Sequence, residues 1–248
     1  MKLFFYILAF SLSTFAKSQN VFVLISTESP PFLSKQMKDQ GAAIYALNMI
    51  LKKMNVSTKI SFAPWRRAKI IASEDLKIDG FFPYSAIDMK DNFIYSNFIY
   101  EAPWVIVQRK THPIRWKKIE DLSGMTAGNV TGVEFRPGIE ELVDQKKIKI
   151  DEVVSDNINL LRLGLERVDF VMMDYFVYQS VMSTDKALLA YKNKFEVNEK
   201  PITISRYGLA LRKTNQNKKR MDQFNQLASV DLFAKHIEYY LSHFVKPN

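Results

Sequence analysis

The first half of the chain alternates short apolar runs with stretches of helical periodicity. Val21 to Ile25 is a continuous run rich in β-branched residues, which is typical of a buried parallel strand. After Gly41, apolar residues recur with the spacing of an amphipathic helix, at Ile44, Leu47, Ile50, Leu51 and Met54. Strand-like alternation over 57–62, a helical stretch over 65–71 and an apolar run over 78–82 follow. This order predicts an α/β unit with a mostly parallel sheet.

The second half of the chain shows the same alternation. After Pro113, the pattern predicts a small-residue strand before a turn at Gly132. Further predicted helices and strands alternate over 139–143, 148–154, 158–165 and 168–173. A strand is predicted over 202–211, and two amphipathic helices follow it and end near Val245. We therefore expect a second α/β unit followed by a returning strand.

The N-terminus has the composition of an export signal. Lys2 supplies a positive charge, Leu3 to Leu12 is apolar, and small residues precede a cleavage position after Ala16. A membrane span would need about 20 apolar residues, and this run has about ten. We therefore predict a signal peptide over 1–16 and a mature protein outside the cytoplasm.

Composition narrows the classes of function further. The chain has no cysteine, which excludes disulfides and thiolate metal sites. Its formal net charge of +9 comes from basic residues interspersed with acids, as in KKIKIDE, so a nucleic-acid groove is not expected. The chain has only three histidines and contains no nucleotide-binding or hydrolase motif. We therefore expect no metal site, no cofactor and no catalytic centre.

Short motifs accompany these elements in a fixed order. In the first half they are ESPPF at 28–32, PWRRA at 64–68, DGFFPY at 79–84 and IYSNFIY at 94–100. In the second half they are DLSG at 121–124, a turn at 128–132 and LGLERVDFVMMD at 163–174. With these motifs the chain resembles the type II periplasmic solute-binding proteins of family 3, the polar amino-acid-binding receptors of ABC importers.

The resemblance implies an α/β fold of two lobes, with mostly parallel sheets and a two-strand hinge. Lobe I would comprise 20–108 and 201–248, and lobe II would comprise 109–200. The hinge strands would lie near 105–109 and 197–202, with the ligand in the cleft between the lobes. The protein would be a periplasmic monomer that closes around its ligand and then meets a membrane permease.

Several residues of lobe I are candidate ligand contacts. Glu28 and Phe32 follow the first strand, and Trp65 and Arg67 begin the next helix on the same side. Arg67 either clamps a carboxylate or is a solvated residue at a helix end, and Trp65 either lines the cleft or lies in the core. The resemblance adds two positions at the end of the third strand, Tyr84 and Ser85.

The family usually has an arginine after the third strand that binds an amino-acid carboxylate. This chain has Ile87, Asp88, Met89 and Lys90 there. Aligned from the preceding strand, Lys90 takes the place of the arginine; aligned from the following segment, Met89 does. With Lys90 the positive charge survives as a point charge, whereas with Met89 the carboxylate anchor is lost.

Three residues of lobe II complete the predicted site. Thr131 and Gly132 form a turn that could receive an anionic group, and Asp174 ends an apolar strand. In the family an acid at the position of Asp174 binds the ligand's amino group. The alternative is that Asp174 caps the next helix.

The resemblance implies a non-enzymatic protein that captures a small polar ligand, an amino acid or a similar molecule, for ABC-type uptake. Two alternatives stay open. A dehydratase-like enzyme of the same fold would need an unpaired acid or base in the cleft, for which Glu28 and Glu134 are the candidates. A ligand sensor would act through a partner receptor.

Overall fold

Residues 20–245 are described in a computed structural model, and the predicted signal peptide lies outside this range. The strands are β1 (Asn20–Ser26), β2 (Val56–Phe62), β3 (Gly80–Ser85), β4 (Phe93–Tyr95), β5 (Tyr100–Arg109), β6 (Thr126–Val130), β7 (Lys149–Val153), β8 (Phe170–Asp174), β9 (Phe195–Val197) and β10 (Thr203–Arg212). The α-helices are α1 (Ala42–Lys53), α2 (Trp65–Glu74), α3 (Ile139–Asp144), α4 (Asp156–Gly164), α5 (Tyr175–Thr184), α6 (Asn215–Leu227) and α7 (Val230–Phe244).

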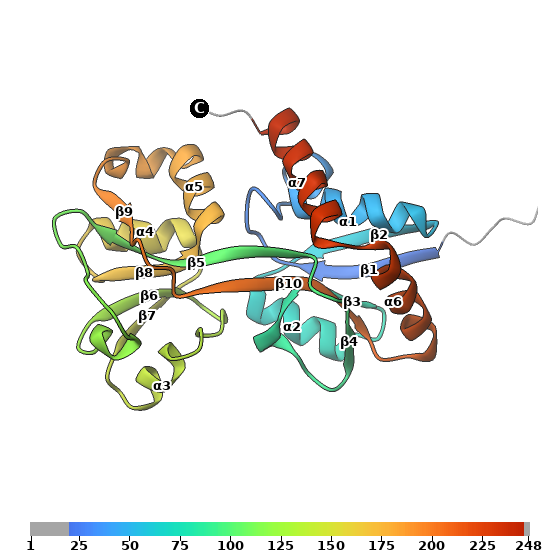
Figure 1. Ribbon diagram of the computed structural model, residues 1–248, viewed down its shortest axis with the longest axis horizontal. Coiled ribbons are helices and arrows are strands. Elements are labelled where there is room, and N and C mark those ends of the chain that lie inside the picture. The colour runs from blue at the N-terminus through green and yellow to red at the C-terminus, as the bar shows by residue number, and fades with distance from the viewer. Residues whose placement is uncertain (1–19, 246–248) are drawn as a thin grey trace, which may run out of the picture.

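All ten of these strands belong to one sheet with two halves (Figure 1). Its order is β2-β1-β3-β10-β5-β8-β6-β7, with β4 beside β10 and β9 beside β5. The neighbours β2-β1-β3 are parallel in one half, and β8-β6-β7 are parallel in the other. We call the first half, with its helices, lobe I and the second half lobe II.

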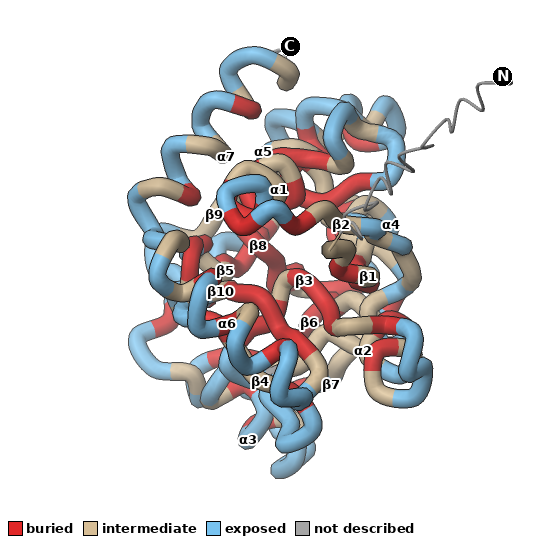
Figure 2. The backbone as a smooth tube through the Cα atoms, turned by 90° about the vertical axis from the view of Figure 1, so that its right-hand side faces the viewer, coloured by how far each residue is buried: buried red, intermediate tan, exposed pale blue. Residues whose placement is uncertain are grey.

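Helices cover both faces of each half-sheet. In lobe I, α1, α6 and α7 cover a core that contains Phe22, Leu47 and Phe233, and α2 covers the opposite face. In lobe II, α4 and α5 lie on one face and α3 on the other. Figure 2 shows the buried strands inside and the exposed outer sides of the helices. Because each lobe has its own core, the two can move as separate bodies.

The long antiparallel strands β5 and β10 join the lobes. They pair from Thr203 opposite Trp104 to Tyr207 opposite Tyr100. Tyr100 and Tyr207 stack with each other in the core of lobe I, whereas Val105 already packs in lobe II. The two strands therefore pass between the lobes a few residues earlier in β5 than the expected 105–109, and a few residues later in β10 than the expected 197–202.

The helices and strands predicted from periodicity are confirmed within a few residues. Short strands such as β4 and β9 were not predicted, because three residues carry too little pattern. No helix between residues 20 and 245 is long and apolar enough to cross a membrane.

Candidate functional site

A cavity of about 1030 Å³ lies between the two lobes. Lobe I contributes the segments that follow β1, β2 and β3, and lobe II contributes those that follow β6, β7 and β8. These six strands are the parallel ones, so their carboxyl ends meet at one place. Ligands bind at such strand ends in open α/β sheets, and the volume suits a drug-sized molecule.

Aromatic side chains form much of the cavity wall. Trp65 begins α2 and packs edge-on against Phe81, with ring centroids 5.8 Å apart. Phe32 is buried, contacts Phe176 of α5 across the lobes and also stacks on Tyr100. Trp65 and Phe32 therefore both pack against other side chains of lobe I and line the cavity, so the two alternatives stated for Trp65 do not exclude each other.

Asp174 lies at the lobe II end of the cavity, as predicted. It is 91% buried and caps α5, because its Oδ1 accepts hydrogen bonds from the backbone N–H groups of Phe176 (2.8 Å) and Val177 (3.2 Å). Both bonds end on one oxygen, so Oδ2 is the atom that can accept from a ligand. Burial raises the pKa of Asp174 to about 6, although the two amide hydrogen bonds and the charge of Arg136 act in the opposite direction.

Asp156 is a second acid of the same cavity, which the sequence did not single out. It begins α4 after β7 and lines the cavity together with Asp174. Its pKa is raised to about 7, first by burial and then by the negative charge of Asp174. Two carboxylates that repel each other in a shielded space favour a cationic group between them.

Arg136 was also missed, because it lies in an irregular loop with no periodic pattern. Its side chain is buried and its guanidinium lies over the ring of Trp104, 3.9 Å from the ring centre. Trp104 is paired with Asp174 across β5 and β8. A cation, an aromatic ring and an acid therefore meet in one corner of lobe II.

Seven of the ten residues predicted to contact a ligand line the cavity, namely Glu28, Phe32, Trp65, Arg67, Ser85, Thr131 and Asp174. Arg67 is exposed at the cavity side of α2 next to Arg66. Glu28 is also exposed, and its carboxylate accepts a hydrogen bond from the backbone N–H of Lys35 at 3.0 Å.

Tyr84 points away from the cavity into the core of lobe I. It is 2% exposed, and its hydroxyl donates to the backbone carbonyl of Ser96. Burial, and then the neighbouring Tyr95, raises its pKa to about 12. The side chains of a strand alternate between faces, and Tyr84 belongs to the inward face at the end of β3. The structure therefore assigns this side chain to packing and not to the cavity wall.

Lys90 does not replace the family arginine in the cavity. It is exposed, and its backbone N–H and carbonyl both bond to the hydroxyl of Tyr95. Met89 is 53% exposed. Among the described residues that line the cavity, neither occurs, so neither alignment supplies a carboxylate anchor there.

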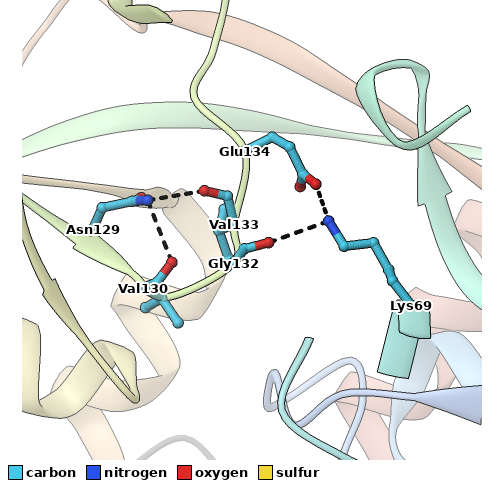
Figure 3. Close-up of polar contacts among 6 residues, drawn as sticks. All are labelled: Lys69, Asn129, Val130, Gly132, Val133 and Glu134. Atoms are coloured by element: carbon cyan, nitrogen blue, oxygen red, sulfur yellow. Dashed lines mark hydrogen bonds and ion pairs between the residues drawn. The ribbon is translucent and has the colours of Figure 1, made fainter. Parts of the chain in front are cut away.

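Gly132 does not line the cavity but lies at its rim. Lys69 of α2 contacts the backbone carbonyl of Gly132 and the carboxylate of Glu134 (Figure 3). Thr131 lines the cavity, and its backbone N–H donates to Val153 of β7 at 2.8 Å. This loop therefore belongs to the contact between the lobes.

Comparison with known proteins gives a match at the level of the fold. No sequence family and no curated protein matches this chain. It is similar to an ancestral arginine-binding protein bound to arginine, with a TM-score of 0.70, 18% identity and coverage of 92% of this chain and 99% of that one. The GluR0 ligand-binding core from Nostoc punctiforme with L-glutamate gives a TM-score of 0.68, 18% identity, and 91% and 100% coverage. The substrate-binding protein of an amino-acid ABC transporter gives 0.65, 17% identity, and 91% and 99% coverage.

This chain has the two-lobed type II periplasmic-binding-protein fold. The fold predicted from the sequence is therefore confirmed. The cavity between the lobes of this periplasmic-binding-protein fold is enclosed by segments from both lobes, so a ligand would contact each of them.

The cavity offers binding groups more clearly than catalytic ones. Glu134 is paired with Lys69 and Glu28 is exposed, so neither is the shielded, unpaired acid that the enzyme alternative needs. Among residues 20–245, no cluster of His, Asp and Glu is arranged to hold a metal ion. The arrangement suits a ligand with an amino group at Asp174 and Asp156 and an apolar part against the aromatic wall.

Proposed function

We propose that this protein is an extracytoplasmic solute-binding protein that captures a small polar ligand, an amino acid or a related amine, between its lobes. The observation that carries the proposal is the cavity itself, which both lobes line at the carboxyl ends of six parallel strands. Such a site couples binding to the relative position of the lobes, because a ligand that contacts both lobes favours the closed form.

The charges of the cavity support an amino group in the ligand. Asp174 and Asp156 lie together in lobe II, and each holds a proton more readily than a solvent-exposed aspartate because its pKa is raised. A ligand ammonium beside these acids would stabilise their ionised forms, in addition to the charge of Arg136. Arg67 lines the cavity from lobe I and would pair with a carboxylate, so a zwitterionic ligand would contact both lobes.

The proposed function includes export and delivery. The apolar N-terminal run supports removal of residues 1–16 and a periplasmic location. Similarity to the substrate-binding protein of an amino-acid ABC transporter supports delivery to a membrane permease. In this proposal the binding protein is a monomer. The enzyme alternative would rest on Asp156 and Asp174, the shielded cavity acids with raised pKa values, whereas the sensor alternative has no observation of its own in the described residues.

A thermal-shift screen against amino acids, amines, small carboxylates and oligosaccharides tests this proposal. A ligand of the folded state raises stability by about 2.7 kcal/mol at 100 times its Kd, which corresponds to about 5–10 °C in Tm. We expect such shifts from amino-bearing compounds and smaller ones with Asp174→Asn. Shifts from oligosaccharides alone, unchanged in that variant, would contradict the proposal.

A further inference from the structure

Helix α2 of lobe I and the loop after β6 in lobe II meet across the cleft (Figure 3). The ammonium of Lys69 donates to the backbone carbonyl of Gly132 at 3.2 Å and forms an ion pair with Glu134. All three groups belong to the chain, so no bound molecule is needed to complete the contact.

The loop that meets Lys69 is held rigid by the interior of lobe II. The side-chain amide of Asn129, 98% buried, donates to the backbone carbonyls of Val133 at 2.9 Å and Val130 at 3.3 Å. These bonds, drawn in Figure 3, fix the turn that presents Gly132 and Glu134. A rigid partner reduces the entropy that Lys69 loses on making the contact.

Lys69 is itself well placed on α2. Its side chain is only 13% exposed, and its ammonium lies 5.4 Å from the ring centre of Trp65, at cation–π distance. The carboxylate of Glu134 is 39% exposed. An ion pair with one shielded partner is screened less by salt than a fully exposed pair.

Gly132 adds a steric condition to this contact. Its φ of +82° is a backbone conformation that glycine adopts most easily. A Cβ atom at this position would lie 2.5 Å from the Cβ of Arg66 and 3.1 Å from its Cα. The two lobes therefore approach each other so closely here that only a glycine fits.

We propose that Lys69, Glu134 and Gly132 form an interlobe latch, which holds the lobes together even without a ligand. The latch sets the ratio of open to closed protein, and so the fraction that is ready to bind. This inference goes beyond the proposed function, because it concerns the protein alone and can be tested without knowing the ligand.

Distances between spin labels on the two lobes test the latch in protein that has been unfolded, dialysed and refolded to remove any ligand. The chain has no cysteine, so Leu76→Cys and Leu165→Cys, at exposed positions of lobes I and II, provide the labels. We expect one short main distance in the parent protein. Glu134→Gln and Lys69→Ala should raise the ratio of open to closed forms by about two- to fivefold. Gly132→Ala should also lengthen the distance.

Two matched controls separate the latch from general effects on stability. Asp151→Asn breaks the ion pair of Asp151 with Arg162, which lies entirely within lobe II and is half-buried on both sides. Gly124→Ala places alanine at a φ of +86° with no atom within 4 Å of its Cβ, so it imposes the same backbone strain without a facing lobe.

The latch is supported if the distance lengthens in the three latch variants and stays short in both controls, with unchanged circular dichroism. It is overturned if the parent protein is already predominantly open. It is equally overturned if Glu134→Gln and Gly132→Ala keep the short distance of the parent protein. Finally, it is overturned if the two control variants open as far as the latch variants.

Discussion

At the scale of single residues, the main feature is a pair of aspartates in a buried environment that disfavours their ionised form. Asp156 and Asp174 face one cavity, and burial raises the pKa of each. Asp185 also lines this region, and Arg136 is the cation whose charge lowers the pKa of Asp174. Such unfavourable placement costs stability, and functional sites commonly carry such a cost.

Replacing Asp156 by asparagine should stabilise the protein at high pH. The pKa of about 7 in the folded protein lies above the usual value of about 3.9, so the folded state holds this proton more tightly than the unfolded state. Stability from this group is therefore complete below pH ~4 and is lost as the pH rises to ~7. We expect Asp156→Asn to raise Tm by about 2–8 °C at pH 8.

Thermal unfolding of the wild type and of Asp156→Asn at pH 8 and pH 4.5 provides the measurement. The difference in Tm should shrink strongly at the lower pH, where Asp156 of the folded protein is protonated. An equal difference at both pH values would show that the carboxylate charge is not the cause.

Position at the end of a predicted strand identified one acid of the cavity from the sequence but not the other. Asp174 was predicted because it ends an apolar strand and because the family has an acid there, whereas Asp156 begins α4 after β7, which is not an apolar strand. The sequence Ser-Asp-Asn around Asp156 is typical of an ordinary helix start, so nothing in it indicated that Asp156 also lines the cavity. Lys90 was chosen by alignment with a family pattern, and the path of the intervening loop takes it to the surface.

At the scale of elements, α1 is the clearest product of sequence periodicity. Its apolar positions are fully buried against β1 and the C-terminal helices, and the helix begins directly after Gly41. By contrast, β5 runs from lobe I to lobe II without any break in composition, so the place where it changes lobes could not be predicted from the sequence.

Shortening Leu47 on α1 should destabilise lobe I. The side chain is fully buried in its core, so Leu47→Ala removes apolar contacts and leaves a cavity. We expect a loss of about 2–5 kcal/mol in the free energy of unfolding, measured by urea denaturation. Lys52→Ala, exposed on the same helix, should change it by less than about 0.5 kcal/mol. Equal effects would contradict the assignment of this core.

At the scale of the whole molecule, the two lobes share one sheet but have separate cores, which permits hinge motion about β5 and β10. The alternation of strands and helices predicted two α/β units, and the family resemblance implied their arrangement as two lobes with a hinge; that all the strands join in one sheet was not predicted. The contacts between the lobes were not predictable, because Lys69 and Glu134 are 65 residues apart and neither belongs to a motif.

Export is a prediction about residues 1–16, which lie outside the described part of the chain. Protein recovered from the periplasm of its native cell should begin at Lys17 or a few residues later, because the apolar run ends in small residues at Ala16. Intact-mass spectrometry measures this directly. Full-length protein that still carries Met1 and accumulates in the cytoplasm would contradict the prediction.

Calorimetric titration of the strongest amino-bearing ligand from the screen tests the central claim most directly. Wild-type protein should bind one equivalent, and Asp174→Asn should bind about 10- to 150-fold more weakly, because a hydrogen bond to a charged group is lost. Lys90→Ala, outside the cavity, should bind like the wild type. If Asp174→Asn binds normally while Trp65→Ala abolishes binding, the cavity holds its ligand by stacking, and the account of an amine held by acids is wrong.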